Sequence, residues 1–431
     1  MIDLDELVER HGVVGAQVAV LHHGGIVDMA AGVLNNVTGE KVTTDSIFQI
    51  GSITKVWTAT LVQELVNEGL LDLDRPVREV LPEFRLADEG AAAIITPRHL
   101  LTHTAGFQGD LFHDVGNGDD MLEKYVERLA DARQEVPTGE LYSYCNSGFT
   151  LLGRIVEVLR GKPFRVVLRE RLIDGLGLRT AAASHAEYAT RTLATGHVGK
   201  EPKPAATLMA EGDAPAGTAL AMSARDLLEF VRMHLGTSEF DAMREIQVVP
   251  PDFGHGGGQG LGWAVHEYPD GVTGIGHTGS TRGYRAYLRV VPGAGLAIAV
   301  LTNGGGSLGL ARAVYEEVLG KEGITLPGLP TPPPLPVPVD VERVVGVYRS
   351  TGLELHVTEG DGGRVKLRYV PLDSGWESFV DGDEHEFTGL RDDALIAVDG
   401  EDGYHPVVVL CGRDEDGRAE HLHWGRAAQR V

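Results

Sequence analysis

The sequence predicts an α+β protein, in which a main body of strands and helices is followed by a small antiparallel β-barrel or sandwich. Strand-like alternation lies near both ends of the first 325 residues, while the stretch from about 86 to 222 is mainly helical and loop. Seven prolines fall between Pro327 and Pro338, a composition that favours a stiff extended linker. After the prolines, short alternating runs are separated by turn residues, as in small barrels.

The predicted boundaries are 1–325 for the main body, 326–339 for the linker and 340–431 for the barrel. Residues 14–33 read as two strands joined at Gly24-Gly25, and residues 53–68 as a buried helix that ends at Gly69. Further helices are expected at 3–11, 121–132, 147–160, 164–172, from Ser223 onward and at 311–319. Further strands are expected at Arg285–Val291, Leu296–Leu301, Val344–Tyr348, Leu353–Val357, Val365–Val370, Val407–Leu410 and Leu422–Trp424.

The overall charge argues against polyanionic partners. Lys plus Arg total 38 and Asp plus Glu total 62, so the net charge is 38 − 62 = −24. This excess repels phosphate backbones and anionic lipid, so neither nucleic acid nor a membrane is expected as a partner. The start MIDLDELVER lacks the basic and apolar regions of a signal peptide. A cytoplasmic location is therefore the expectation.

No cofactor and no metal are expected. The two cysteines are far apart and form no disulfide framework. His421 and His423 share a strand face but lack an evident third ligand. The acidic stretch that contains Asp110 is interpreted as solvated surface rather than a calcium site. Cys145 is interpreted as a packing residue.

The first candidate for chemistry is Gly51-Ser52-Ile53-Thr54-Lys55. On a helix, residues three apart share a face, so Lys55 should lie one turn behind Ser52. A serine hydroxyl needs a nearby base to become a nucleophile, and a lysine kept neutral by apolar surroundings can supply one. The alternative is a serine that caps the helix and a lysine on the surface.

Two further segments complete the candidate site. Tyr144 and Asn146 precede a predicted helix; a phenol near a cation can act as acid or base, and the amide can orient Lys55 or a substrate carbonyl. Their alternative is loop packing and helix capping. The third segment, at the start of a strand, offers backbone N–H groups to an oxyanion and contains His277, Thr278, Gly279 and Ser280.

Together, in this order, the three segments resemble the serine β-lactamase and penicillin-binding-protein superfamily, in its class C-like branch. That branch includes D,D-peptidases, esterases, D-aminopeptidases and penicillin-binding-protein-type thioesterases. The resemblance covers about residues 10–320 and extends to 99–107, 74–77, Gly217 and 222–227. The C-terminal part resembles the lipocalin-like barrel that some members append.

The resemblance implies an antiparallel sheet flanked by helices, with an all-helical region of about 86–222 inserted and the active site at their junction. It implies Ser52 as nucleophile, Lys55 as base, Tyr144 as acid and base, and Asn146 as an orienting group. His277 would lie on the substrate side, with Thr278, Gly279 and Ser280 contacting substrate. His277 stands where relatives carry lysine, which speaks against β-lactamase action because histidine is charged only part of the time near neutral pH.

The leading hypothesis is a serine hydrolase or acyltransferase that acts on a small-molecule ester or on a peptide with a D-residue. A narrower alternative is a stand-alone thioesterase that takes a nonribosomal peptide from its carrier and closes it into a ring. A third is a non-catalytic sensor that traps an acyl group on Ser52.

Overall fold

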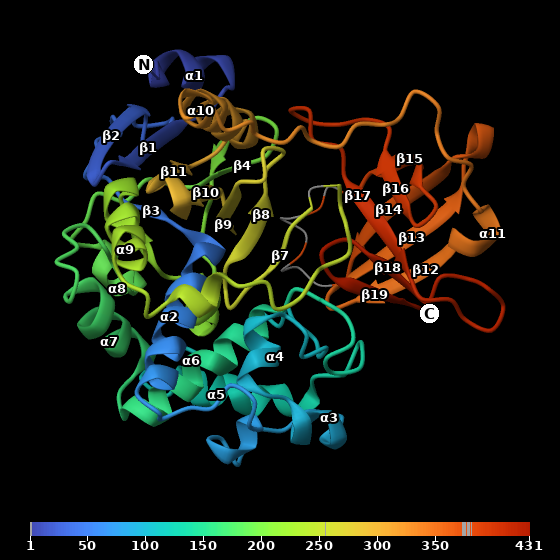
Figure 1. The fold of residues 1–431 in the computed structure, drawn as a ribbon, viewed down its shortest axis with the longest axis horizontal. Helices are drawn as coiled ribbons and strands as arrows, with labels where there is room; N and C mark the ends of the chain where they lie inside the picture. Colours follow the sequence, from blue (N-terminus) through green and yellow to red (C-terminus); the bar gives the residue numbers. More distant parts are fainter. Residues whose placement is uncertain (1, 255, 373–375, 377–379, 381) are drawn as a thin grey trace.

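A computed structural model describes residues 2–254, 256–372, 376, 380 and 382–431. Figure 1 shows two bodies, a larger one with a sheet and most of the helices, and a β-barrel beside it. The sheet of the larger body is antiparallel and has the strand order β2-β1-β11-β10-β9-β8-β7. The strands are β1 Gly15–His22, β2 Gly25–Gly32, β7 Gly258–Gln259, β8 Ala264–Glu267, β9 Thr273–Thr281, β10 Tyr284–Val291 and β11 Leu296–Thr302.

The two ends of the larger body meet in the middle of this sheet. Ala16 of β1 pairs with Thr302 of β11, although nearly 300 residues separate them in the chain. One face of the sheet packs against α1 (Leu4–Arg10) and α10 (Ser307–Lys321), and the other against α9 (Ala224–Gly236). Alternate residues of the central strands therefore belong to two different cores.

The helical region lies beyond one end of the sheet (Figure 1). Its central helix is α2, Thr54–Asn67, where the Trp57 ring stacks on Phe230 of α9 with 3.9 Å between ring centres. The neighbouring helices are α3 Glu89–Ile94, α4 Pro97–Leu101, α5 Met121–Arg128, α6 Asn146–Arg160, α7 Phe164–Leu168 and α8 His185–Tyr188. Two short two-stranded sheets join β3 Phe48–Gln49 to β6 Ala221–Met222, and β4 His197–Val198 to β5 Lys203–Pro204.

The C-terminal body is a closed barrel of eight antiparallel strands. Its interior is filled by large apolar side chains such as Leu355, Leu367 and Phe387. A short helix, α11 (Val341–Val344), precedes the strands β12 Gly346–Ser350, β13 Leu353–Glu359, β14 Val365–Pro371, β15 Glu384–Arg391, β16 Ala394–Ala397, β17 Val407–Cys411, β18 His421–His423 and β19 Ala427–Arg430.

The predicted fold class is confirmed, and the elements of the barrel differ from expectation in two respects. The run predicted as a strand from Val344 begins as the end of α11, because the side chain of Asp340 accepts a hydrogen bond from Arg343 N and caps a helical turn there. Strands β15, β16 and β19 were not predicted. β15 carries polar side chains on both faces at its start, so it lacks the clean alternation that marks a strand in sequence.

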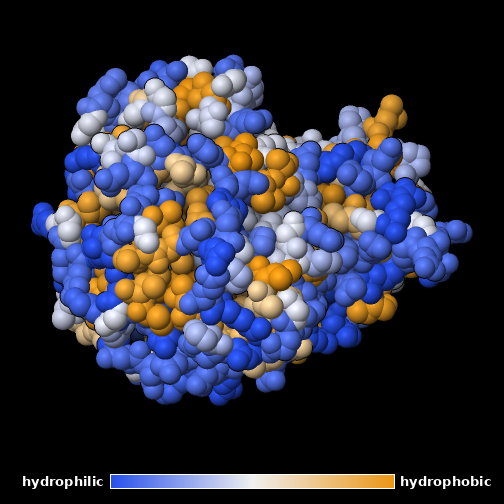
Figure 2. All heavy atoms as spheres, turned by 60° about the horizontal axis from the view of Figure 1, so that its bottom comes forward, coloured by the Kyte–Doolittle hydropathy of each residue, from blue (hydrophilic) through white to orange (hydrophobic). Residues whose placement is uncertain are grey.

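Figure 2 shows mainly hydrophilic residues on the face that carries the helical region, interrupted by a hydrophobic patch. Leu70 and Val158 are among the exposed apolar side chains, and both line a groove beside α2 and α6. Among the described residues, every helix is too short or too polar to cross a bilayer.

Candidate active site

Ser52 lies at the start of the central helix. Gly51 has a left-handed backbone (φ 53°), and a short 3-10 turn, Gly51–Ile53, leads from it into α2. The turn places Ser52 at the end of the helix that carries Lys55, and Lys55 Nζ lies 3.1 Å from Ser52 Oγ. Ser52 is partly exposed, whereas Lys55 is fully buried beneath it.

Lys55 Nζ has two further partners, Asn146 Oδ1 at 2.6 Å and the carbonyl oxygen of Ala216 at 2.7 Å. Burial lowers the pKa of Lys55 to about 7. A neutral amine has two N–H groups and one lone pair. Because the two carbonyl-type oxygens can only accept, the two N–H groups stay with them, and the lone pair is left for the Ser52 hydroxyl. The geometry therefore suits removal of the Ser52 proton.

Tyr144 and Asn146 flank the start of α6. The side chain of Ser52 lies close enough to the Tyr144 phenol to oppose the rise in its pKa, and Lys55 Nζ lies 4.8 Å from the centre of the Tyr144 ring. Burial raises the pKa of Tyr144 above its ordinary value, so the phenol stays protonated at neutral pH. Cys145 Sγ accepts a hydrogen bond from Gly148 N and caps α6, in agreement with a packing role.

His103 supports the tyrosine from behind. Its ring stacks on the Tyr144 ring with 4.3 Å between centres. Its Nδ1 accepts a hydrogen bond from Cys145 N at 3.0 Å, so the ring is neutral with its proton on Nε2. Burial holds the pKa of His103 well below its usual range, which agrees with this assignment.

The third segment lies on β9. This strand pairs with β8 only up to Gly276, and beyond that point its second edge borders the Ser52 turn. The approach is close: a Cβ on Gly51 would lie 2.5 Å from Ser280 N, and one on Gly279 would lie 1.9 Å from the carbonyl oxygen of Ile50. Glycine is therefore required at both positions. The backbone of Ser280 therefore lies against the turn that carries Ser52.

His277 is buried and does not carry the charge of a lysine. Its Nδ1 lies 2.6 Å from the carbonyl oxygen of Thr278, so Nδ1 holds the proton. Burial lowers the pKa of His277 to about 3, with nearby Lys55 as a further cause. The imidazole is thus neutral near pH 7.

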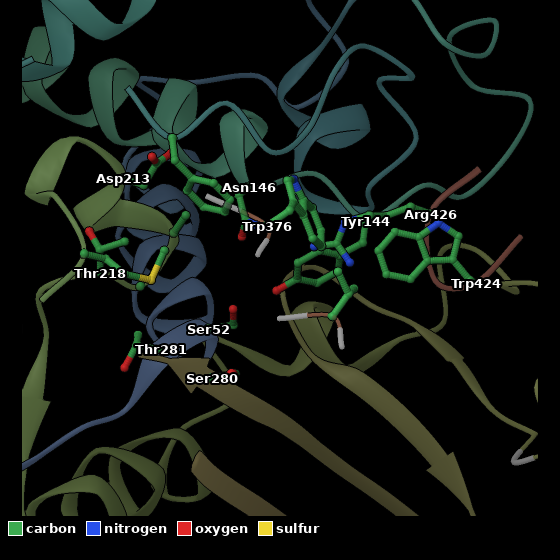
Figure 3. A pocket seen from close by; sticks show the side chains of 15 residues that line it. Ser52, Tyr144, Asn146, Asp213, Thr218, Ser280, Thr281, Trp376, Trp424 and Arg426 are labelled. Atoms are coloured by element: carbon green, nitrogen blue, oxygen red, sulfur yellow. The ribbon is translucent and has the colours of Figure 1, made fainter. Parts of the chain in front are cut away.

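A pocket of about 260 Å³ opens beside Ser52. In Figure 3, Asp213 and Thr218 lie on one side of Ser52, and Trp424 and Arg426 on the other. Of the predicted site residues, Ser52, Tyr144, Asn146 and Ser280 line this pocket; Lys55, His277, Thr278 and Gly279 do not. The remaining lining residues are Phe112, Met209, Asp213, Ala216, Gly217, Thr218, Thr281, Trp376, Val380, Trp424 and Arg426.

The barrel supplies one wall of the pocket, which the sequence did not predict. The guanidinium of Arg426 lies 5.1 Å from the Tyr144 ring centre and 5.1 Å from that of Trp424. It also pairs with Asp110, whose side chain is only 1% exposed. The interpretation of Asp110 as solvated surface is therefore wrong: it is buried because an arginine from the barrel neutralises it.

Asp213 is a second buried acid that the sequence did not indicate. It accepts a hydrogen bond from Thr150 Oγ1 at 2.9 Å, and burial raises its pKa to about 7. For Asp110, the one signal in the sequence for a place near the site is that it lies three residues beyond the 99–107 stretch, which resembles the family. Neither Asp213 nor Arg426 belongs to a recognisable pattern.

Comparisons with known proteins identify the family of the chain. The Beta-lactamase family matches residues 3–320. "Penicillin-binding protein 4" of Amycolatopsis lactamdurans is 40% identical over 81% of this chain and 96% of its own length. Esterase EstB of Burkholderia gladioli is 32% identical over 42% of this chain and 50% of its own. The crystal structure of SurE with D-Leu is 29% identical with a TM-score of 0.77, covering 99% of this chain and 97% of that one. The chain therefore belongs to the β-lactamase family of serine hydrolases and is a penicillin-binding-protein homologue.

Proposed function

We propose that this protein forms an acyl-enzyme on Ser52 and takes its acyl group from an ester or thioester whose carbonyl belongs to a D-residue of a peptide. The observation that carries the proposal is the set of contacts around Lys55. Two acceptor oxygens hold its N–H groups, so that its lone pair is left for Ser52 Oγ at 3.1 Å.

In the proposed acylation, neutral Lys55 takes the Ser52 proton as Oγ bonds to the substrate carbonyl carbon. The negative charge that develops on the carbonyl oxygen faces the amide groups of Ser52 and Ser280. As the tetrahedral intermediate collapses, the bond to the leaving group breaks and the leaving group takes the proton of the Tyr144 phenol. Tyr144 is then reprotonated from Lys55, whose ammonium lies beside its ring.

Deacylation repeats these steps in reverse. Water or an amine gives its proton through Tyr144 and Lys55 as it attacks the ester carbonyl, and Ser52 Oγ leaves with a proton. Water yields a free acid, and an amine yields an amide. We expect no turnover of β-lactams such as nitrocefin, because the neutral His277 offers no charge for the substrate carboxylate.

The D-configuration is proposed from similarity, and an apolar side chain from the lining of the pocket. SurE, which aligns over nearly the whole chain, was crystallised with D-Leu. The pocket beside Ser52 is lined by apolar side chains that suit an aliphatic or aromatic group, among them Phe112, Met209, Trp376 and Trp424. The esterase relative supports an ester or thioester as the scissile bond.

Release of the peptide as a ring is the second candidate. The barrel closes one side of the pocket with Trp424 and Arg426, and such a wall would hold a folded peptide against the acyl-enzyme and exclude water. The similarity to SurE includes the barrel. The amine that attacks the acyl-enzyme would then be the amino end of the same peptide.

One experiment tests both candidates. The protein is incubated with two N-acetylcysteamine thioesters of one peptide with a free amino end, which differ only in a D- or L-Leu at the carbonyl. We expect the D-peptide to react roughly 10- to 100-fold faster, because only one configuration places both side chain and carbonyl correctly. Equal rates, or a faster L-peptide, would refute the proposed stereochemistry.

The mass of the product separates the remaining possibilities. A linear acid indicates hydrolysis, and loss of one water from that mass indicates ring closure. An adduct on Ser52 that persists for hours with both peptides would instead favour the acyl-trapping sensor. No adduct and no product with any ester or thioester would overturn the proposed function as a whole.

The rate of acylation is expected to depend on pH through Lys55. Its pKa is lowered to about 7, and only the neutral amine accepts the Ser52 proton. Acylation should therefore be slow at pH 5, rise through pH 7 and level off above about pH 8. Stopped-flow release of p-nitrophenol from a p-nitrophenyl ester measures this directly. A rate that falls as pH rises from 6 to 8 would contradict neutral Lys55 as the base.

A further inference from the structure

A continuous chain of polar contacts leads from the barrel to the base. Arg426 pairs with Asp110 through both carboxylate oxygens. Asp110 Oδ1 accepts a hydrogen bond from Asn146 Nδ2 at 2.5 Å. Asn146 Oδ1, in turn, accepts one from Lys55 Nζ at 2.6 Å. Two members of this chain, Asp110 and Arg426, have no part in the chemistry proposed above.

The orientation of the Asn146 amide decides where the lone pair of Lys55 points. A carboxylate can only accept, so Asp110 requires the Asn146 NH2 group on its own side and leaves the oxygen toward Lys55. With the amide turned over, its NH2 group would face Lys55 and compete with the Ser52 hydroxyl for the lone pair. The base would then be present but directed away from the nucleophile.

We propose that Asp110 and Arg426 are positioning residues of the active site: Asp110 locks the Asn146 amide with its oxygen toward Lys55, and Arg426 of the barrel holds Asp110 in place. The inference rests on the proposed acyl-enzyme function. It makes the C-terminal barrel a working part of the site, since the residue that secures Asp110 comes from the end of the chain.

The docking of the barrel supports this role. The loop between β18 and β19 lies along the segment that carries the catalytic tyrosine. Tyr144 N donates to the carbonyl of Gly425 at 3.1 Å, and Ala427 N donates to Ser143 Oγ at 3.1 Å. Two residues before Gly425, His423 Nε2 lies 2.6 Å from the Tyr142 carbonyl oxygen. Arg426 is thus fixed by hydrogen bonds on both sides of it.

The test is the pH dependence of acylation in Asp110→Asn, Arg426→Gln and the double variant. Removing the Asp110 charge removes a group that favours protonated Lys55, so the rise in rate should move to lower pH. Removing the Arg426 charge should move it to higher pH. At the plateau we expect each single variant to be roughly 10- to 100-fold slower, as for a lost hydrogen bond to a charged group.

The other titratable groups around Lys55 keep their side chains in all variants. Asp213, with a pKa of about 7, titrates in the same range as Lys55. Asp110 helps to raise the pKa of Asp213, so Asp110→Asn lowers it, and the ionised Asp213 then offsets part of the shift in the pKa of Lys55. His103 and His277 stay neutral because their pKa values are held low. Tyr144 and Cys145 stay protonated because burial raises their pKa values. The direction of each shift therefore reports on the charge that was removed.

The double variant separates positioning from damage. Arg426→Gln leaves a buried carboxylate without its partner, and adding Asp110→Asn removes that charge, so the profile should move back toward that of the wild type. If the substitutions simply damaged the fold, the loss of acylation rate in the double variant would instead be the combined loss of the two single variants. Another ion pair between barrel and main body, Asp252 with Arg391, is the matched control. Asp252→Asn and Arg391→Gln should leave rate and profile unchanged.

The outcomes are distinguishable from failure of the proposed function. If the wild type forms no Ser52 adduct, the function itself is wrong. If the wild type acylates and both single variants keep its plateau rate and its profile, the inference alone is overturned. Shifts of the two single variants in the same direction would also overturn it, because opposite charges cannot act alike on Lys55.

Discussion

Replacing Ser52 by Ala is expected to lower turnover of the thioester by about 10⁴- to 10⁶-fold, the loss typical of removing a serine nucleophile. The expectation follows from the position of Ser52. It is the hydroxyl that lies 3.1 Å from Lys55 Nζ, interacts with the Tyr144 phenol and lines the pocket. Alanine removes one oxygen atom and adds no volume, so the fold should be retained.

Covalent labelling makes the result specific to the nucleophile. A fluorophosphonate probe should add one adduct to the wild type, detected by intact-protein mass spectrometry, and none to Ser52→Ala. The matched control is Ser238→Ala, because Ser238 is an exposed serine outside the pocket. It should label and turn over like the wild type. Labelling of Ser52→Ala at the rate of the wild type would refute Ser52 as the nucleophile.

The local part of the site could be predicted from the sequence. Ser52 and Lys55 are three residues apart on a helix, so their proximity follows from helix geometry alone. The place of Tyr144 could be predicted because its segment resembles that of a known family. Strands β1, β2, β10 and β11 of the main sheet were predictable for a similar reason, since alternation and tight turns are local signals.

The environment of these residues could not be predicted. Arg426 reaches Asp110 across more than 300 residues of chain, and no local pattern marks either partner. An aspartate is rarely buried unless it is paired, and the sequence does not show which residue is the partner of Asp110. The neutral state of His277 likewise depends on burial, which arises only when β9 packs against the Ser52 turn.

Replacing Lys55 by Met is expected to slow acylation by about 10²- to 10⁴-fold, the usual contribution of a general base. Methionine has a similar length and no charge, so it fills the same buried space. The loss should be visible as a slower burst of p-nitrophenol at every pH from 6 to 9. Lys41→Met, at an exposed lysine, is the matched control and should keep the rate of the wild type.

The same substitution should change stability in a way that depends on pH. The pKa of Lys55 is lowered from 10.5 in the unfolded chain to about 7 in the folded protein. Between these two pH values the unfolded chain binds more protons than the folded protein. Lys55 therefore makes the free energy of unfolding of the wild type rise as the pH increases. The cost of burying the ammonium is fully present below pH 7, and methionine removes it.

The difference in melting temperature, Lys55→Met minus wild type, should therefore be larger at pH 6 than at pH 9. Comparing the two pH values cancels the cost of leaving Asn146 Oδ1 and the Ala216 carbonyl without a donor, because that cost is the same at both. Differential scanning fluorimetry of both proteins at each pH gives the comparison. A relative melting temperature that increases from pH 6 to pH 9 would mean that Lys55 is not held neutral by burial, and the proposed base would lose its physical basis.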